Sequence, residues 1–227
     1  MNLKKTETFI TYVFGFIIII CCVFIVKDYA NYKTAQTEYE RLNSYIDLPD
    51  EAKDQKLEKT DIPYMSPNTE KPSEIEKLQE INPDFTGILS IPVLGLTYPV
   101  VQGADNEKYL HCTFEGKKNP AGCLFMDHTN SRFYTDDNTV IYGHNMKDGS
   151  MFGSLKRFIK EDFDKSEVRA FVITKSGTIS YRLEKAEVVN IDAYKAPKEM
   201  HDTLTLYTCW SNEKNRRLLV TFIKEKG

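Results

Sequence analysis

The chain has 227 residues, and its 30 Lys and Arg side chains against 33 Asp and Glu give a formal net charge of −3. With 41% hydrophobic and 28% charged residues, the composition excludes a disordered chain, a collagen-like chain and a disulfide-dense miniprotein. The isoelectric point near 5.9 and the lack of a Lys/Arg-rich block argue against a nucleic-acid partner, because phosphate binding needs a basic surface.

The first predicted element is a membrane span. Residues 8–26 carry no charge, and of these 19 residues only Thr8, Thr11 and Gly15 are not hydrophobic. A helix of this length, at about 1.5 Å per residue, just crosses a hydrocarbon core of roughly 30 Å. A cleaved signal peptide has a shorter apolar core followed by small residues, whereas Lys-Asp-Tyr follows here at residues 27–29. We therefore predict an uncleaved, single-pass signal anchor at residues 8–26.

The orientation of this anchor depends on its flanks. Lysines lie close to it on both sides, so the positive-inside signal is weak. A short tail is the easier segment to leave in the cytoplasm, and we predict residues 1–7 to lie there. Everything after residue 26 would then lie on the extracellular face of the cell membrane.

Residues 27–72 are predicted to form a juxtamembrane helix followed by a linker. Between residues 28 and 46, five side chains recur at helical spacing and would face one partner surface: Tyr32, Ala35, Tyr39, Leu42 and Ile46. Residues 48–72 hold four of the nine prolines among many charged residues, a composition typical of an irregular connection.

The domain that follows, residues 73–227, begins with a short predicted helix. Ser73 followed by Glu76 has the spacing of a capping box, which satisfies the free backbone N–H groups of a first turn. Ile75, Leu78 and Ile81 then give an apolar face.

Short strands dominate the rest of the chain. Apolar runs separated by turn residues predict strands at 87–92, 95–101, 122–126, 139–142, 168–173, 178–183, 204–209 and 218–224. One helix is predicted at residues 151–159, where apolar side chains follow helical spacing. About eight strands with one inserted helix indicate a mainly β fold, either a barrel or a sandwich.

Thiol chemistry is the strongest catalytic candidate. The sequence contains no phosphate loop, dinucleotide fingerprint, zinc-protease motif, serine-hydrolase elbow or paired C-x-x-C. Outside the span there are three cysteines, Cys112, Cys123 and Cys209, so at least one thiol must be unpaired. Cys209 ends an apolar strand, where a rigid scaffold presents a side chain to a cleft.

A cysteine nucleophile needs a partner, because an unassisted thiol is mostly protonated at neutral pH. Among the four histidines, His144 lies at the end of a predicted strand, a position like that of Cys209, whereas His111, His128 and His201 are predicted to lie on the surface. Cys112 and Cys123 with His111 or His128 would be an alternative metal set, but their spacing is not that of a zinc site.

A cation is the third candidate component. Arg216 and Arg217 open the last strand, and if it pairs with the strand before it, one of them returns beside Cys209. A fixed guanidinium there would stabilise the oxyanion of an acyl-transfer intermediate. Neighbouring side chains point to opposite faces, so only one of the two can do so.

These residues resemble a known family. Thr-Leu-Tyr-Thr-Cys at 205–209 with Arg at the next strand, and Val-Ile-Tyr-Gly-His-Asn-Met at 140–146 ahead of a helix, are similar to class B sortases. Residues 78–84 and 98–103 are similar to the start of a class B domain. The chain departs from the common class B pattern at Tyr207, often Ser, and at Ser211, where some relatives carry an acid.

The resemblance implies a closed β-barrel with N-terminal helices, and a cysteine transpeptidase of Gram-positive cell surfaces that needs no cofactor or metal. Cys209 matches the nucleophile, His144 the acid/base and Arg217 the arginine that supports the oxyanion. The residues expected to bind substrate are Thr208, Tyr207, Ser211, Tyr142 and Asn145.

The implied substrates are surface proteins with a C-terminal sorting signal, of the Asn-Pro-x-Thr type, cleaved after Thr through a thioacyl intermediate. The implied acceptor is an amine of peptidoglycan or its lipid-linked precursor. Two alternatives remain at this stage. A non-catalytic, membrane-tethered β-domain that binds a wall component would share the anchor and barrel, but would not explain why Cys, His and Arg all lie at strand ends. A papain-like peptidase is disfavoured because its nucleophile precedes its histidine.

Overall fold

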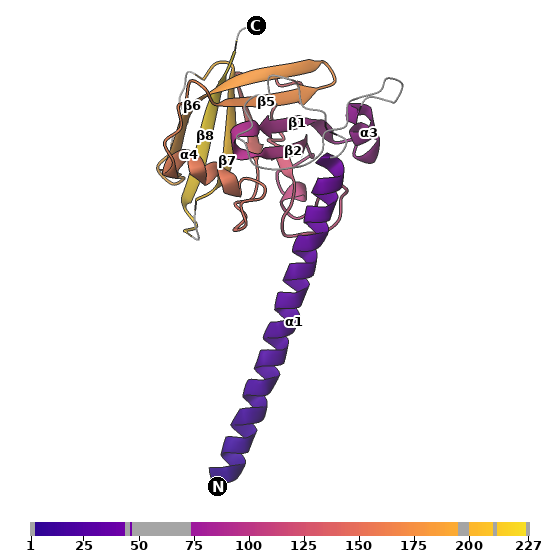
Figure 1. Ribbon diagram of the computed structural model, residues 1–227, viewed down its shortest axis with the longest axis vertical. Coiled ribbons are helices and arrows are strands. Elements are labelled where there is room, and N and C mark those ends of the chain that lie inside the picture. Colours follow the sequence, from indigo (N-terminus) through magenta and orange to yellow (C-terminus); the bar gives the residue numbers. More distant parts are fainter. Residues whose placement is uncertain (1–2, 44–45, 47–73, 195–199, 211–212, 226–227) are drawn as a thin grey trace.

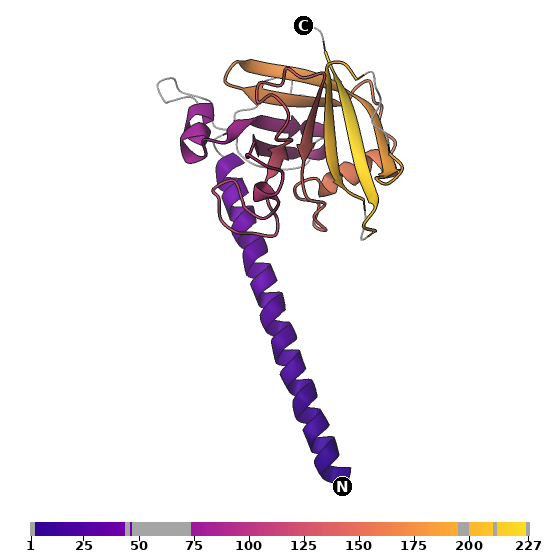
Figure 2. The ribbon, with the colours of Figure 1, turned by 180° about the vertical axis from the view of Figure 1, so that it is seen from behind.

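The computed structural model describes residues 3–43, 46, 74–194, 200–210 and 213–225. The C-terminal end of a long helix, α1 (Leu3–Asn43), packs against a β-barrel, and the rest of the helix projects away from it (Figure 1). The N-terminus lies at the far end of α1, and the C-terminus lies at the opposite end of the molecule (Figures 1 and 2). The linker predicted at residues 48–72 lies outside the described residues.

Helix α1 combines two of the predicted segments without a break. Its N-terminal half exposes large apolar side chains such as Phe24 and Val26, and it is the one described helix long and apolar enough to cross a membrane. Its C-terminal turns bury Ala35, Tyr39 and Leu42 against the barrel. The predicted apolar stripe is therefore confirmed, and the same helix reaches from the apolar segment to the domain.

Eight strands close into the predicted barrel. They are β1 (Phe85–Ile91), β2 (Leu96–Val101), β3 (Leu124–Met126), β4 (Asn138–Tyr142), β5 (Arg169–Thr174), β6 (Gly177–Asn190), β7 (Thr203–Cys209) and β8 (Arg216–Lys224). Their order around the barrel is β1-β2-β3-β4-β7-β8-β6-β5. Pairs β2–β3 and β4–β7 are parallel and all others are antiparallel. The interior is filled by alternating apolar side chains of these strands.

The short helices lie outside the barrel wall. They are α3 (Glu74–Ile81), the 3-10 turns η1 (Pro92–Leu94), η2 (Lys108–Leu110) and η3 (Gly153–Lys156), and α4 (Arg157–Lys160). Helix α3 confirms the predicted helix before Pro83.

Most strand ends differ from the sequence-based prediction by one or two residues, and two of the differences have a clear structural cause. Strand β6 runs seven residues beyond the predicted end at residue 183, because it pairs with β5 first and then with β8, across a bulge between Leu183 and Lys185. The helix predicted from Met151 begins only at Gly153. Met151 has a φ of 50° and bridges back to Asn145, so it closes a loop instead of opening a helix.

The parallel β4–β7 pair gives the first testable prediction. Ile141 of β4 is fully buried inside the barrel, whereas Ile159 of α4 is 39% exposed. We expect Ile141→Ala to lower the free energy of unfolding by about 2–5 kcal/mol, through lost burial and the cavity left behind. The matched Ile159→Ala control should cost about 1 kcal/mol or less. Denaturant unfolding of the detergent-solubilised protein measures both, and equal losses would contradict the assigned core.

Candidate active site

The register of two strand pairs brings three chemically active side chains to one end of the barrel. In the parallel β4–β7 pair, Tyr142 lies beside Tyr207. His144 and Cys209 each follow two residues later, so both chains leave the barrel together. In the antiparallel β7–β8 pair, Cys209 lies directly opposite Arg217.

Strand alternation puts Cys209 and Arg217 on the outer face of the wall. On β7, Leu204, Leu206 and Thr208 are buried inside, while Tyr207 and Cys209 point outward. Residues directly opposite in an antiparallel pair share a face, so the Arg217 side chain projects on the side of the Cys209 thiol. Arg216 has the parity of the inward-facing Leu218 and makes an ion pair with Glu213 at 3.7 Å.

The Arg217 guanidinium is held close to the backbone of its own turn. Its Nη1 donates to the carbonyl oxygens of Lys214, at 2.6 Å, and Arg216, at 3.1 Å. The pKa of Tyr207, on the same face, is raised chiefly by burial, while the positive charge of Arg217 acts in the opposite direction. Arg217 thus lies close to both Tyr207 and the end of β7.

The imidazole of His144 is fixed by one hydrogen bond. Its Nε2 lies 2.8 Å from the carbonyl oxygen of Leu110, the last residue of η2. A carbonyl only accepts, so Nε2 carries the proton and Nδ1 is the nitrogen that remains for acid/base work. The backbone oxygen of His144 accepts from Phe152 N–H at 2.9 Å, which closes the loop behind it.

Two glycines make room for this histidine. At Gly122, which has a φ of +61°, an added Cβ would lie 3.1 Å from His144 Cδ2 and 2.7 Å from the Tyr109 carbonyl oxygen. At Gly143, an added Cβ would lie 2.4 Å from Leu124 Cδ2 and 2.7 Å from a ring carbon of Phe152. Gly122 therefore lets the backbone lie close to the imidazole, and Gly143 lets Leu124 and Phe152 pack against the backbone just before the histidine.

Asn145 joins the histidine loop to the end of β7. Its Nδ2 donates to the carbonyl oxygens of Cys209, at 2.7 Å, and Trp210, at 3.3 Å. Its Oδ1 is buried and has no hydrogen-bond partner among the described residues. This amide fixes the spacing of the two strand ends.

The other predicted substrate-binding residues have different placements. Tyr142 stacks between Phe125 and Tyr207, and its hydroxyl donates to Asp127 Oδ2 at 2.9 Å. Burial raises the pKa of Asp127, but this bond and those from its loop outweigh it and hold that pKa low. Thr208 is only 2% exposed and points into the barrel, so we assign it no substrate contact. Ser211 lies outside the described residues.

An open hollow of about 740 Å³ lies over this end of the barrel. Its lining consists of His144, Asn145, Lys147, Lys156, Cys209, Trp210 and Glu213. Four of these residues, Lys147, Lys156, Trp210 and Glu213, were not identified from the sequence, because the fold brings them in from loops and from η3. Lys147 and Trp210 directly follow the motifs at 140–146 and 205–209, whereas no motif marks Lys156 or Glu213.

The remaining cysteines and histidines do not form a second site. Cys112 and Cys123 are both free thiols, and within the described residues no three His, Cys, Asp or Glu side chains gather as a metal site would require. His111, His128 and His201 are exposed. Burial raises the pKa of the Cys123 thiol to about 12, so it is protonated at neutral pH.

Comparison with known proteins agrees with this arrangement. The protein-family model that describes the sortase domain matches residues 89–222 of the chain. The chain belongs to the sortase family. It is 33% identical over 162 residues to sortase B of Listeria monocytogenes and 31% identical over 163 residues to sortase B of Staphylococcus aureus. The resemblance to class B sortases is thereby confirmed.

The matches cover 70% and 72% of this chain, but only 65% and 61% of the length of the two relatives. Solved sortase structures share the fold. Sortase B from Bacillus anthracis in complex with AAEK1 superposes with a TM-score of 0.66 at 24% identity, over 88% of this chain and all of that one. A Staphylococcus aureus sortase B–substrate complex gives 0.60 at 24% identity, over 67% and 87%.

The contrast between the exposed and the buried thiol is testable. At about pH 7.5, we expect iodoacetamide to alkylate Cys209 in the folded protein and to leave Cys123 unmodified, because only thiolates react and Cys123 is buried and protonated. Peptide mass spectrometry locates the label, and a urea-denatured sample should be labelled at both cysteines. Labelling of Cys123 as fast as Cys209 in the folded state would contradict the assignment.

Proposed function

We propose that this protein is a membrane-anchored cysteine transpeptidase that cleaves a C-terminal sorting signal and joins the released surface protein to a peptidoglycan amine. One observation carries the proposal: Cys209 and Arg217 lie opposite each other on an outer face, beside a histidine whose Nδ1 has no hydrogen-bond partner among the described residues. Membership of the sortase family supports the same reaction.

In the first half-reaction, Nδ1 of His144 takes the proton of the Cys209 thiol, and the resulting thiolate attacks the carbonyl carbon of the Thr peptide bond. A C–S bond forms and the carbonyl oxygen becomes an oxyanion, which the Arg217 guanidinium stabilises. Protonated Nδ1 of His144 then gives its proton to the leaving nitrogen, the C–N bond breaks, and a thioester on Cys209 remains.

In the second half-reaction, an amine attacks the thioester carbonyl. Nδ1 of His144, now neutral, takes the proton that the amine loses, and a new amide bond forms as Cys209 leaves as a thiolate. The hollow beside Cys209 is open enough to admit a second chain to the thioester. The proton on His144 is thus restored for the next cycle.

The position of the site relative to α1 suits substrates at a membrane. The end of β7 and the start of β8 lie at the end of the barrel from which α1 leaves (Figures 1 and 2). With the apolar half of α1 as a single-pass anchor, the catalytic end would face the membrane from outside, where exported substrates and lipid-linked cell-wall precursors emerge.

For the sorting signal we propose an Asn-Pro-x-Thr-like sequence. Tyr207, Tyr142 and Asn145 would contribute to its binding surface, because the two tyrosine rings lie on the outer face that carries Cys209 and Asn145 lines the hollow beside it. The contribution expected of Ser211 stays a prediction from the sequence.

The paired arginines allow a matched test with the detergent-solubilised protein. Quenched fluorescent pentapeptides of the Asn-Pro-x-Thr, Ser-Pro-x-Thr and Leu-Pro-x-Thr types are incubated with an acceptor amine. We expect cleavage after Thr, abolished in Cys209→Ala and reduced roughly 100-fold or more in Arg217→Ala, since an oxyanion donor contributes about that much. Arg216→Ala should stay within about threefold of wild type, because its side chain has the opposite parity.

Product identification separates the alternatives. Mass spectrometry should find both the shortened peptide and its amide with the acceptor. Equal losses in the two arginine variants would overturn the assignment of Arg217. No cleavage by folded wild-type protein with a free Cys209 thiol would favour the non-catalytic binding domain.

A further inference from the structure

The last turns of α1 contact the segment that contains Leu110, whose carbonyl oxygen is the hydrogen-bond partner of His144. The Tyr39 hydroxyl donates to the Gly122 carbonyl oxygen at 2.7 Å, in a buried position. About two turns earlier along the helix, the Asn31 carbonyl oxygen accepts from Asn119 Nδ2 at 2.7 Å. These contacts hold residues 107–123, which comprise η2 and the loop from η2 to β3, against the helix.

A buried carboxylate fixes the same contact. Glu38 is 3% exposed, and it accepts from Thr113 Oγ1 and from the Glu115 backbone N–H, both at 3.0 Å. Arg41 forms an ion pair with Glu115. A buried charge is tolerated only where its hydrogen bonds are complete, so the helix has one favourable rotation and height against this segment.

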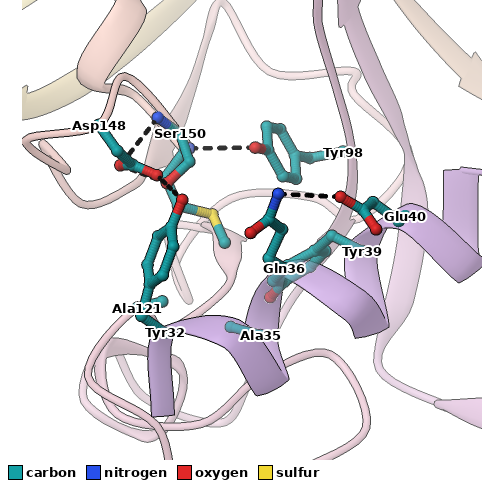
Figure 3. Close-up of a pocket in the computed structure, with 10 residues that line it drawn as sticks. Tyr32, Ala35, Gln36, Tyr39, Glu40, Tyr98, Ala121, Asp148 and Ser150 are labelled. Atoms are coloured by element: carbon teal, nitrogen blue, oxygen red, sulfur yellow. Dashed lines mark hydrogen bonds between the residues drawn. The ribbon is translucent and has the colours of Figure 1, made fainter. Parts of the chain in front are cut away.

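The same helix face also holds the loop that carries His144 itself (Figure 3). The Tyr32 hydroxyl donates to Asp148 Oδ2 at 2.5 Å, and Asp148 in turn accepts from the Ser150 hydroxyl at 2.9 Å. Beyond them, the Tyr98 hydroxyl accepts from the Met151 backbone N–H at 3.2 Å. Tyr98 packs edge-on against Tyr39, with ring centroids 5.3 Å apart.

His144 lies where these two segments meet. From the first segment, the Leu110 carbonyl accepts from Nε2 and the Gly122 backbone packs against Cδ2. From the second come the histidine itself and Phe152, whose N–H closes its loop. One helix face therefore contacts both walls of the imidazole site, through Tyr39 on one side and Tyr32 on the other.

We propose that residues 31–42 of α1 are a positioning element for His144, in which the Tyr32 and Tyr39 hydroxyls hold the two segments so that Nε2 stays on Leu110 and Nδ1 faces the thiol. The proposal rests on the function proposed above, in which His144 transfers the proton. Because α1 has no break between its apolar half and Asn43, the element that positions the catalytic histidine is also the end of the membrane anchor.

The test uses the full chain in detergent micelles and three single Tyr→Phe changes on one helix. Tyr32→Phe and Tyr39→Phe each remove one hydroxyl from the contact, and Tyr29→Phe, at a position that is 64% exposed, is the matched control. Three quantities are measured: the nitrogen-15 shifts of the His144 ring, which report the tautomer; kcat and KM for peptide cleavage; and the melting temperature.

We expect both contact variants to lose the single Nε2–H tautomer and to lower kcat roughly tenfold with KM nearly unchanged, since small misplacements of a catalytic group cost up to about 100-fold. Tyr29→Phe should behave as wild type in all three measurements. If the two contact variants change the His144 tautomer but the wild-type protein cleaves no peptide, the positioning role is supported and the proposed reaction is rejected. The two claims can therefore fail separately.

Two results would overturn the inference. The first is a His144 spectrum and a kcat in Tyr32→Phe and Tyr39→Phe that match those of Tyr29→Phe. The second is a lower melting temperature with an unchanged tautomer, because α1 would then stabilise the domain without setting the histidine.

Discussion

The parallel pairing of β4 with β7 is the constraint on which the site depends. Parallel strands end at the same edge of a sheet, so the residues that follow Tyr142 and Tyr207 leave the barrel side by side. His144 and Cys209 are 65 residues apart in the chain, and this one register makes them neighbours. A shift of one residue would turn the Cys209 side chain to the inside of the barrel.

The register of the antiparallel β7–β8 pair places Arg217 opposite Cys209. Local contacts then fix the positions of the strand ends that carry His144 and Cys209. Asn145 ties the two strand ends through the Cys209 carbonyl, and Gly122 lets the backbone approach the imidazole. The chemistry therefore rests on groups held by backbone geometry, with little freedom to rearrange before the substrate arrives. Such preorganisation is what acyl transfer through an oxyanion requires.

Much of this could be predicted from the sequence, because the signals were local. Strand alternation and turn residues gave the eight strands, and helical spacing gave the buried stripe of α1. Family resemblance favoured Arg217 over Arg216, while strand parity indicated only that one of the two can lie beside the thiol. The inner placement of Thr208 follows from the same alternation, but the resemblance had suggested a substrate contact for it.

Other features depended on contacts between distant segments. The polar run after Leu183 is a strand only because β8 pairs with it, and Met151 leaves the helix because it closes a loop onto Asn145. Lys147 and Lys156 reach the hollow from two separate turns. The bond from His144 to Leu110 joins residues with no common motif, so no pattern in the sequence indicated it.

The central claim is that strand pairing places the imidazole of His144 where it can exchange a proton with the thiol of Cys209. It is tested most directly by the single-turnover rate at which a sorting-signal peptide forms an adduct, followed by intact-protein mass spectrometry. The account predicts an adduct on Cys209 alone, formed roughly 100-fold or more slowly in His144→Ala and partly restored by added imidazole. An unchanged rate in folded His144→Ala would contradict it.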